Sequence, residues 1–492
     1  MKLSRRDLAG ATVLTPLAAI PILQHTIPVA AATGPAGPPG PWEMGAKPDY
    51  RLSLAAQEVE LFGHKIQGLL VNGSWPGTAI RYNRGDRFRV LVENLLDQPT
   101  SLHWHGLVDP NLQDGVPNVT QAPIKPGDAL YYEFDLKQAG TFWYHSHFGL
   151  QEQQGLGGPL IIEDPNEPHA YDHDLVIMLN DVVDIPVEDV VPKIRNGTLQ
   201  VSVSEPYALP DGATFRIDVP YTGYLLNGQT PDNPWSYGLK AGSRARLRLI
   251  NGSGSSFFRI AIDGLQLTLI TADGDPVEPI VVNSLVIGTG ERYDVLVTLR
   301  ESGSYTLHAA ALGDDKQALG VLHTPDVAPS ANHDRPSFAG KALQPKDLKA
   351  PFATIPPDGP GKFFEVILSG DMRNYLWTMN EHAWPEPFAA YAGDQAEETY
   401  YDVAFGEVVR FDLLNRTPMA HPMHLHGHSF RVLVEGTDPA RAPLRDTFVA
   451  WPHGKVTMEV VTYNPGKWFF HCHNAWHLAV GMAQAVQYKV SA

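Results

Sequence analysis

One ten-residue pattern occurs three times in the chain, and it constrains the fold more than any other feature of the sequence. The copies are GDRFRVLVEN at 85–94, GSRARLRLIN at 242–251 and GEVVRFDLLN at 406–415. Each follows the pattern Gly-polar-x-x-Arg-h-x-h-x-Asn, where h is apolar, and successive copies begin 157 and 164 residues apart. A repeated phrase at such regular spacing indicates a chain built from three related units.

Each of the three units has the residue pattern of β-structure. Short alternating or apolar runs lie between turn residues, which is typical of strands. These runs are 87–96, 129–136, 140–145 and 159–164; then 243–251, 257–262, 293–299 and 304–309; then 407–414, 429–434, 456–462 and 467–471. No run of ten or more residues has convincing helical periodicity, and 44 Gly and 42 Pro suit a chain of many turns. We therefore expect an all-β fold of three β-sandwich domains.

The turns and the Pro-rich stretches between these units predict the domain boundaries. The expected domains cover residues 45–165, 172–325 and 361–492, and a Pro-rich linker covers 326–360. Residues 33–44 are too rich in Pro and Gly to form an element, so we expect a flexible N-terminus there.

Residues 1–32 have the features of an export signal. A pair of arginines at 5–6 precedes a mostly apolar stretch at 8–23, and three alanines at 30–32 offer a cleavage site. This resembles a bacterial twin-arginine signal peptide, which implies the twin-arginine export machinery as a partner and a periplasmic or secreted mature protein. A membrane anchor is disfavoured, because the stretch is shorter than about 18 residues and contains two prolines. We expect no membrane span in the mature chain.

The composition excludes some classes of function. With 37 Lys and Arg against 54 Asp and Glu, the formal charge is −17, which argues against a nucleic-acid partner. A single cysteine excludes an intrachain disulfide framework. The 20 histidines, in contrast, leave many candidate metal ligands.

Half of the histidines fall in four short clusters, all in the first and last units. The clusters are His103-Trp104-His105, His145-Ser146-His147, His421-Pro422-Met423-His424-Leu425-His426, and His471-Cys472-His473 followed by His477 and Met482. Residues two apart in a strand share one face, so each His-x-His pair presents two imidazoles side by side. Four such pairs favour a shared metal centre over isolated surface or core histidines.

The same alternation predicts two sites on opposite faces of neighbouring strands. Cys472 faces away from its two flanking histidines, and His421 faces away from His424. One site then holds eight imidazoles: His103, His105, His145, His147, His424, His426, His471 and His473. The other holds His421, Cys472, His477 and Met482, which is the ligand set of a blue copper site. Zinc also binds thiolate with imidazole, but it has no redox role. We therefore expect electrons to pass through Cys472 to the eight imidazoles.

Together the clusters give the pattern HxH…HxH…HxxHxH…HCHxxxHxxxxM. On these motifs the chain resembles a three-domain multicopper oxidase, the family of laccases, ascorbate oxidase and bacterial periplasmic copper-resistance oxidases. The resemblance covers nearly the whole chain after the signal, and it implies three cupredoxin-like Greek-key β-sandwich domains with four copper ions. It also implies the ligands of each ion: His421, Cys472, His477 and Met482 for type 1; His103 and His424 for type 2; His105, His145, His147, His426, His471 and His473 for the type 3 pair.

The resemblance further implies an oxidoreductase that uses dioxygen as the acceptor. A small-molecule reductant would be oxidised one electron at a time at the type 1 site, and four electrons would reduce dioxygen to water at the trinuclear cluster. We predict laccase-like oxidation of phenolic or similar organic reductants. The alternative is a periplasmic cuprous oxidase in copper tolerance. It is suggested by the Gln-Glu-Gln sequence at 151–153, after His147, which resembles the periplasmic copper-resistance oxidases. Only nine methionines, none in a run, weaken that alternative. A non-catalytic relative is disfavoured by the complete ligand set.

Carboxylates are predicted to deliver the protons that water formation needs. Asp114 lies nine residues after His105, where the family has a carboxylate near the type 2 copper, and it is the predicted proton donor; an ordinary Asp-Gly turn is the alternative. Bacterial relatives often carry a carboxylate just after the last type 1 histidine, but Leu478 occupies that position here. Glu152 could substitute for it, with a solvated loop glutamate as the alternative.

Overall fold

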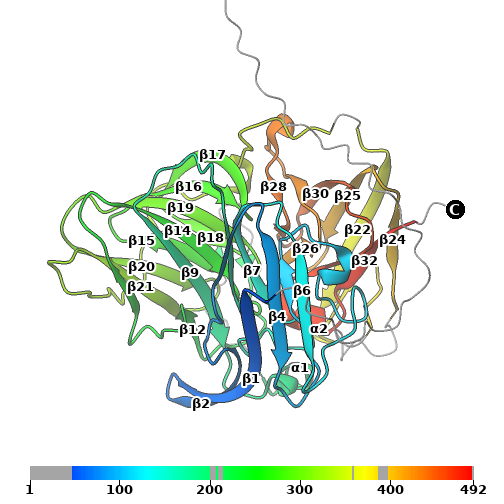
Figure 1. The fold of residues 1–492 in the computed structure, drawn as a ribbon, viewed down its shortest axis with the longest axis horizontal. Helices are drawn as coiled ribbons and strands as arrows, with labels where there is room; N and C mark the ends of the chain where they lie inside the picture. The colour runs from blue at the N-terminus through cyan, green and yellow to red at the C-terminus, as the bar shows by residue number, and fades with distance from the viewer. Residues whose placement is uncertain (1–46, 200–206, 209–213, 357–358, 386–396, 490–492) are drawn as a thin grey trace, which may run out of the picture. The chain divides into compact units, whose positions relative to one another are not determined.

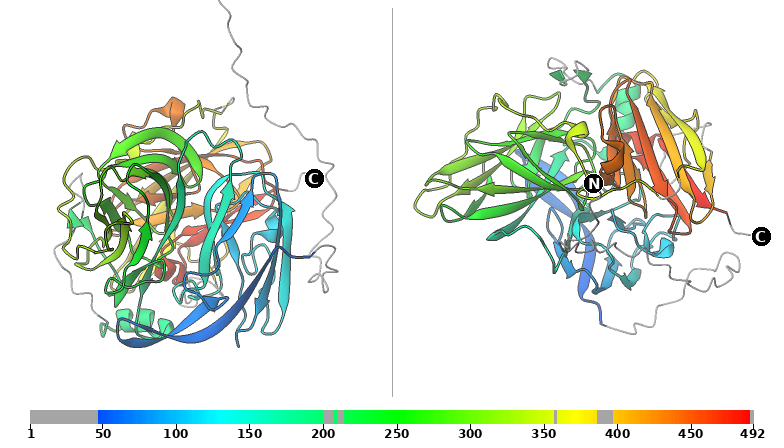
Figure 2. Two further views of the ribbon diagram at one scale, coloured as in Figure 1. Left: turned by 60° about the vertical axis from the view of Figure 1, so that its left-hand side comes forward. Right: turned by 90° about the horizontal axis from the view of Figure 1, so that it is seen from above.

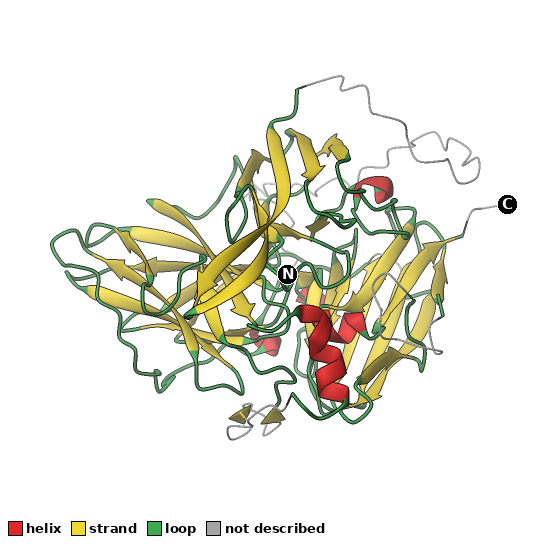
Figure 3. Ribbon diagram, turned by 90° about the horizontal axis from the view of Figure 1, so that it is seen from below, coloured by secondary structure: helices red, strands yellow, loops and turns green. Residues whose placement is uncertain are grey.

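Strands account for most of the ordered structure. The computed structural model describes residues 47–199, 207–208, 214–356, 359–385 and 397–489. Within these ranges the strands form six sheets of four to six strands and one two-stranded pair, and Figure 3 shows how few helices accompany them. The expected signal peptide at 1–32 and flexible N-terminus at 33–44 lie outside the described residues. The prediction of an all-β chain is confirmed.

The first part of the chain forms two four-stranded sheets. Its strands are β1 (Tyr50–Leu61), β2 (His64–Val71), β3 (Ile80–Asn83), β4 (Arg87–Asn94), β5 (His103–His105), β6 (Ala129–Asp135), β7 (Gly140–His145) and β8 (Gly157–Glu163). One sheet has the order β2-β1-β4-β6 and the other β3-β8-β7-β5. Figure 1 shows these strands in blue and cyan.

The middle part forms a six-stranded and a five-stranded sheet. Its strands are β9 (His173–Val182), β10 (Tyr207–Ala208), β11 (Thr214–Phe215), β12 (Gly223–Leu226), β13 (Trp235–Gly238), β14 (Arg244–Asn251), β15 (Phe258–Ile262), β16 (Leu267–Ala272), β17 (Asp275–Val282), β18 (Leu285–Ile287), β19 (Arg292–Thr298), β20 (Ser304–Ala311) and β21 (Gln317–His323). The sheet orders are β12-β9-β14-β19-β16-β17 and β13-β21-β20-β15-β18, and β10 pairs with β11.

The last part repeats the arrangement of a six-stranded and a five-stranded sheet. Its strands are β22 (Lys362–Asp371), β23 (Leu376–Met379), β24 (Tyr400–Val403), β25 (Val408–Asn415), β26 (His421–Leu425), β27 (Phe430–Leu433), β28 (Leu444–Arg445), β29 (Thr447–Ala450), β30 (Lys455–Val461), β31 (Lys467–Cys472) and β32 (Ala483–Tyr488). The orders are β23-β22-β25-β30-β27-β28 and β24-β32-β31-β26-β29. The three colour groups of Figure 2, blue to cyan, green, and yellow to red, follow these three parts. The exact domain boundaries stay predictions.

Helices are short in the described residues. They are α1 (Val187–Arg195) and α2 (Ala475–Ala479), with 3-10 turns at Asn111–Gln113, Pro345–Asp347 and Pro439–Arg441. In the described part of the chain, no helix has the length and apolar character needed to cross a membrane.

The repeated sequence pattern corresponds to one strand in each part of the chain. Strands β4, β14 and β25 each pair in parallel with the first strand of their part and antiparallel with a later one. The glycine that begins each copy has a positive φ: 96° for Gly85, 87° for Gly242 and 82° for Gly406. Glycine adopts this backbone conformation without the steric cost that other residues meet, so the turn requires it.

The asparagine that ends each copy makes the same set of hydrogen bonds three times. Its Oδ1 accepts from the backbone N–H two residues later, at 2.9 Å for Asn94, 3.1 Å for Asn251 and 2.9 Å for Asn415. Its Nδ2 donates to one carbonyl in the following loop and to another 30 to 36 residues further along the chain. The repeat is therefore structural: each asparagine joins two loops at the end of its sheet.

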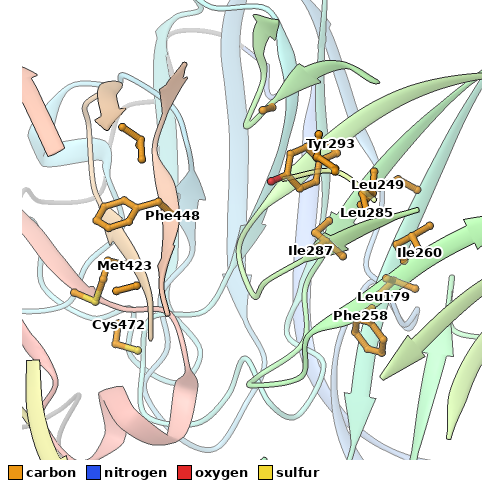
Figure 4. Close-up of a cluster of buried hydrophobic side chains, with 14 of the residues drawn as sticks. Leu179, Leu249, Phe258, Ile260, Leu285, Ile287, Tyr293, Met423, Phe448 and Cys472 are labelled. Carbon is orange, nitrogen blue, oxygen red and sulfur yellow. The ribbon is translucent and has the colours of Figure 1, made fainter. Parts of the chain in front are cut away.

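Apolar side chains from the middle and last parts form one continuous core, and the first part has a core of its own. Figure 4 shows a portion of the larger core, with Leu249 and Ile287 on the middle part and Met423, Phe448 and Cys472 on the last part. Cys472 is fully buried and packs as part of this core.

The repeated asparagine gives a test of the fold. In an Asn251→Ala variant, the N–H of Ser253 and the carbonyls of Ser256 and Ile287 lose a buried partner. Each unpaired buried polar group costs about 1–3 kcal/mol, so we expect a clear fall in the thermal unfolding midpoint. Asn233→Ala, which removes a side-chain bond on the surface, is the control. Equal midpoints for the two variants would contradict the structural role of the repeat.

Candidate metal centre

Eight imidazoles from four chain segments meet in one buried cluster. Strand β5 pairs with β7 so that His103 lies opposite His145, and β26 pairs with β31 so that His424 lies opposite His471. The full set comprises His103, His105, His145, His147, His424, His426, His471 and His473, none more than 3% exposed. The structure thus brings together all eight histidines that the sequence predicts for this site.

Two of these histidines, His103 and His424, are held by the same kind of hydrogen bond. Nδ1 of His103 donates to the backbone carbonyl of Asp114 at 2.8 Å, and Nδ1 of His424 donates to that of Asp446 at 2.8 Å. Among the described residues, Nε2 of both rings is buried without a hydrogen-bond partner. A buried nitrogen lone pair fixed in this way is what a metal ligand requires.

The other six rings form two groups of three. Nε2 of His473 lies 3.2 Å from Nδ1 of His105 and 3.4 Å from Nε2 of His145. In the second group, Nε2 of His426 and His471 are 3.0 Å apart, and the His147 ring centroid lies 4.9 Å from each of theirs. The three nitrogen–nitrogen distances, 3.2, 3.4 and 3.0 Å, are those of nitrogens that share one ion at about 2.0–2.1 Å each. A nitrogen of His147 also lies within 4.8 Å of nitrogens of His103 and His426.

Burial keeps seven of these imidazoles neutral. It lowers the pKa of His105, His145, His147, His424 and His426 well below the usual value, aided by neighbouring imidazoles. For His471 and His473, burial lowers the pKa to about 3. Neutral imidazole is the form that binds a metal, so these seven rings are in the form that a metal ligand needs.

The second predicted site lies on the other face of β31. Sγ of Cys472 is 3.7 Å from Nδ1 of His421 and 3.6 Å from Nδ1 of His477, and the two nitrogens are 3.0 Å apart. Met482 is fully buried, and its backbone bonds to both Cys472 and His477. Two imidazoles and a thiol within this distance fit one metal ion, and the soft sulfur suits copper.

The two sites are connected through one residue pair. Nδ1 of His471 donates to the carbonyl of Cys472 at 2.9 Å, so a ring of the eight-imidazole cluster is hydrogen-bonded to the residue whose thiol lies in the other site. The alternation of β31 places the two side chains on opposite faces, as the sequence predicts.

Both carboxylates singled out in the sequence lie beside histidines; Asp114 is fully buried, and the side chain of Glu152 is 11% exposed. Oδ2 of Asp114 lies 3.1 Å from Nδ1 of His426, and its Oδ1 lies 3.1 Å from Nδ1 of His103. Oε2 of Glu152 lies 2.9 Å from Nδ1 of His145, and burial raises the pKa of Glu152 to about 7. The alternative of a solvated loop glutamate is therefore wrong, because the loop after β7 folds back over the cluster.

Three polar residues at the two sites carry no sequence signal. Asp446 contacts the eight-imidazole cluster, and Arg292 of the middle part contacts Asp446. Oδ2 of Asp218, also from the middle part, lies 2.9 Å from Nε2 of His477 and accepts from Tyr375 Oη at 2.7 Å. Although burial acts to raise it, these hydrogen bonds hold the pKa of Asp218 below its usual value. None of the three belongs to a histidine motif.

Comparison with known proteins agrees with this geometry. Family models described as multicopper oxidase match residues 54–167, 176–325 and 357–492. Multicopper oxidase MmcO of Mycobacterium tuberculosis is 34% identical over 445 residues, covering 87% of this chain and 85% of that protein. Copper resistance protein A of Escherichia coli is 28% identical, with coverages of 92% and 97%. Laccase-2 of Botryotinia fuckeliana is 32% identical, with coverages of 89% and 81%.

A solved structure gives the same result for the fold. The laccase from Botrytis aclada superposes with a TM-score of 0.75 at 29% identity, covering 89% of this chain and 87% of that one. The expected cupredoxin-like fold is confirmed. Because the family models cover most of the chain and span both histidine-bearing parts, the chain belongs to the multicopper oxidases, oxidoreductases that bind four copper ions and use dioxygen as the electron acceptor.

Proposed function

We propose that this protein is a laccase-like oxidase of phenolic or similar organic reductants. The observation that carries the proposal is the pairing of two complete donor sets: a Cys-His-His group and an eight-imidazole cluster joined by the His471–Cys472 hydrogen bond. When bound, copper supplies one-electron oxidation of the reductant and four-electron reduction of dioxygen to water. The protein's side chains hold the ions, position the rings and exclude bulk water.

The proposed ligands follow the two donor sets. His421, Cys472 and His477, with Met482, would hold the type 1 ion. His103 and His424, whose Nε2 atoms have no partner among the described residues, would hold the type 2 ion. The group of His105, His145 and His473 and the group of His147, His426 and His471 would hold the two type 3 ions.

Asp114 is proposed to deliver protons to the cluster. Its carboxylate is fully buried and contacts one ring from the first part of the chain, His103, and one from the last part, His426. From that position it can hold a proton at Oδ1 or Oδ2 and pass it toward the space between the rings. Glu152 lies beside His145 as Asp114 lies beside His426. This contact supports Glu152 as a second proton donor, in place of the carboxylate that is absent at Leu478.

The number and spacing of the methionines favour an organic reductant over Cu(I). Cu(I) is bound by soft thioether ligands, and the nine methionines do not form the run that would collect it. Oxidation of cuprous ions in copper tolerance remains the second candidate, favoured by the likeness to copper resistance protein A over 97% of that protein's length. We also propose export by the twin-arginine route to the periplasm or beyond the cell.

The reductant can be tested by oxygen consumption. Copper-loaded protein is supplied in parallel with a phenol, an aromatic amine and Cu(I), and we expect faster turnover with an organic donor, because no methionine-rich segment is present to collect Cu(I). Faster turnover with Cu(I) than with any organic donor would replace the laccase-like proposal with the cuprous oxidase.

The type 1 assignment can be tested by removing its sulfur. Cys472→Ser takes away the thiolate, so we expect loss of the intense blue absorption and of turnover, with the copper of the imidazole cluster retained. Met458→Leu changes a buried sulfur residue on β30 and should keep the colour. A blue Cys472→Ser protein would refute the assignment.

The proton role can be tested with Asp114→Asn. The amide cannot carry the proton, so we expect a fall in turnover of about 10²-fold or more, with copper content and blue colour unchanged. Turnover equal to that of the unmodified protein would remove Asp114 from the mechanism, and loss of copper would assign it a purely structural role.

A further inference from the structure

Two aspartates from different parts of the chain hold the imidazole cluster through similar contacts. The backbone carbonyl of Asp114 accepts from His103 of the first part, while its carboxylate reaches His426 of the last part. The backbone carbonyl of Asp446 accepts from His424 of the last part, while its carboxylate lies 3.3 Å from Nε2 of His105 of the first part. Each aspartate therefore contacts one ring through its backbone carbonyl and, through its carboxylate, a second ring that comes from the other of these two parts.

The two aspartates differ in their counter-charge. In the described residues, the carboxylate of Asp114 contacts the rings of His103 and His426. Asp446 is clamped by Arg292, whose Nη1 and Nη2 lie 2.6 and 2.5 Å from its two carboxylate oxygens. This planar two-point contact fixes both the position and the plane of the carboxylate.

Arg292 is itself held rigidly. Nε donates to the carbonyl of Thr141 at 3.1 Å, Nη1 to that of Gly290 at 3.0 Å, and Nη2 to that of Asp273 at 3.0 Å. With the two bonds to Asp446, all five N–H donors are used, and the side chain is fully buried. The guanidinium thus joins all three parts of the chain at one point.

Two glycines allow this close approach. A Cβ on Gly106, which follows His105, would lie 2.5 Å from Nη2 of Arg292 and 2.6 Å from Oδ2 of Asp446. A Cβ on Gly290 would lie 2.9 Å from Cδ2 of His473. The loop that carries Gly290 and Arg292 therefore forms part of the wall of the cluster, although the middle part has no histidine in the predicted ligand set.

We propose that Arg292 is a positioning residue of the copper cluster: by clamping Asp446, it fixes the rings of His105 and His424 for the metal. The inference rests on the proposed function, which places a type 2 ion on His424 and a type 3 ion on His105. Nδ1 of His424 bonds directly to the backbone carbonyl of Asp446. In contrast, Nε2 of His105 bonds to Thr447 Oγ1 at 3.1 Å, and that hydroxyl donates to Oδ1 of Asp446 at 2.9 Å. In each ring the opposite nitrogen faces the cluster, because hydrogen bonding at one imidazole nitrogen directs the other toward the metal. Loosening the clamp releases both rings.

Arg292→Lys tests this proposal, because lysine keeps the charge and loses the planar fork. We expect type 2 copper to bind about 10–100-fold more weakly. The copper content should fall by about one ion per chain at limiting copper, and the type 2 electron paramagnetic resonance signal should weaken or change, with the blue type 1 absorption kept. Arg248→Lys is the matched control. Arg248 is also buried, and it bonds to the carboxylates of Glu163 and Asp174, neither of which contacts a histidine of the cluster.

A second variant removes the risk of an unpaired buried charge. Arg292→Gln combined with Asp446→Asn leaves both positions neutral, and we expect the same loss of type 2 copper. A type 2 signal and copper content unchanged in Arg292→Lys and in the double variant would overturn the positioning role. An unmodified protein that takes up copper with no type 2 signal would instead overturn the proposed function itself.

Discussion

Strand alternation at two pairs of strands is the constraint on which the rest of the structure depends. Pairing of β5 with β7 sets His103 opposite His145, and pairing of β26 with β31 sets His424 opposite His471. A slip of one residue in either pair would turn its histidines to the opposite face. In β31 it would also exchange Cys472 with its neighbours, merging the thiol with the imidazole cluster. Two chemically distinct sites can therefore share one strand only while this register holds.

Such a concentration of buried polar groups is stable only where each group has a partner. One nitrogen of each of several rings bonds to an oxygen, either a backbone carbonyl, as for His103 and His424, or a carboxylate, as for His426. Neutral rings avoid the large cost of burying charge, and the buried carboxylate of Asp446 is offset by Arg292. Removing one member of this network leaves the charge or polar group of its partner buried without compensation. The cluster therefore depends also on residues, such as Arg292, that reach it only through another side chain.

The sequence predicted the parts of the molecule that depend on local pattern. The repeated phrase identified β4, β14 and β25, since a strand and its turn are short-range features, and the His-x-His spacing identified all eight clustered histidines. Asp446, Arg292 and Asp218 escaped prediction because their roles depend on the approach of distant segments. Glu152 was only partly predictable. Its position after His147 can be read from the sequence, but its contact with His145 depends on how the loop packs.

The middle part of the chain supplies none of the predicted ligands, but it contacts both predicted sites. Its Arg292 clamps the aspartate beside His105, and its Asp218 contacts the outer nitrogen of His477 at the other site. These two contacts come from different stretches of the middle part, so both sites depend on the same body. Its sheets also share one continuous core with the last part, so movement of the middle part would disturb both contacts. A unit that carries none of the predicted ligands can thus hold the geometry of both predicted sites, because a site works only when surrounding residues keep its ligands in position.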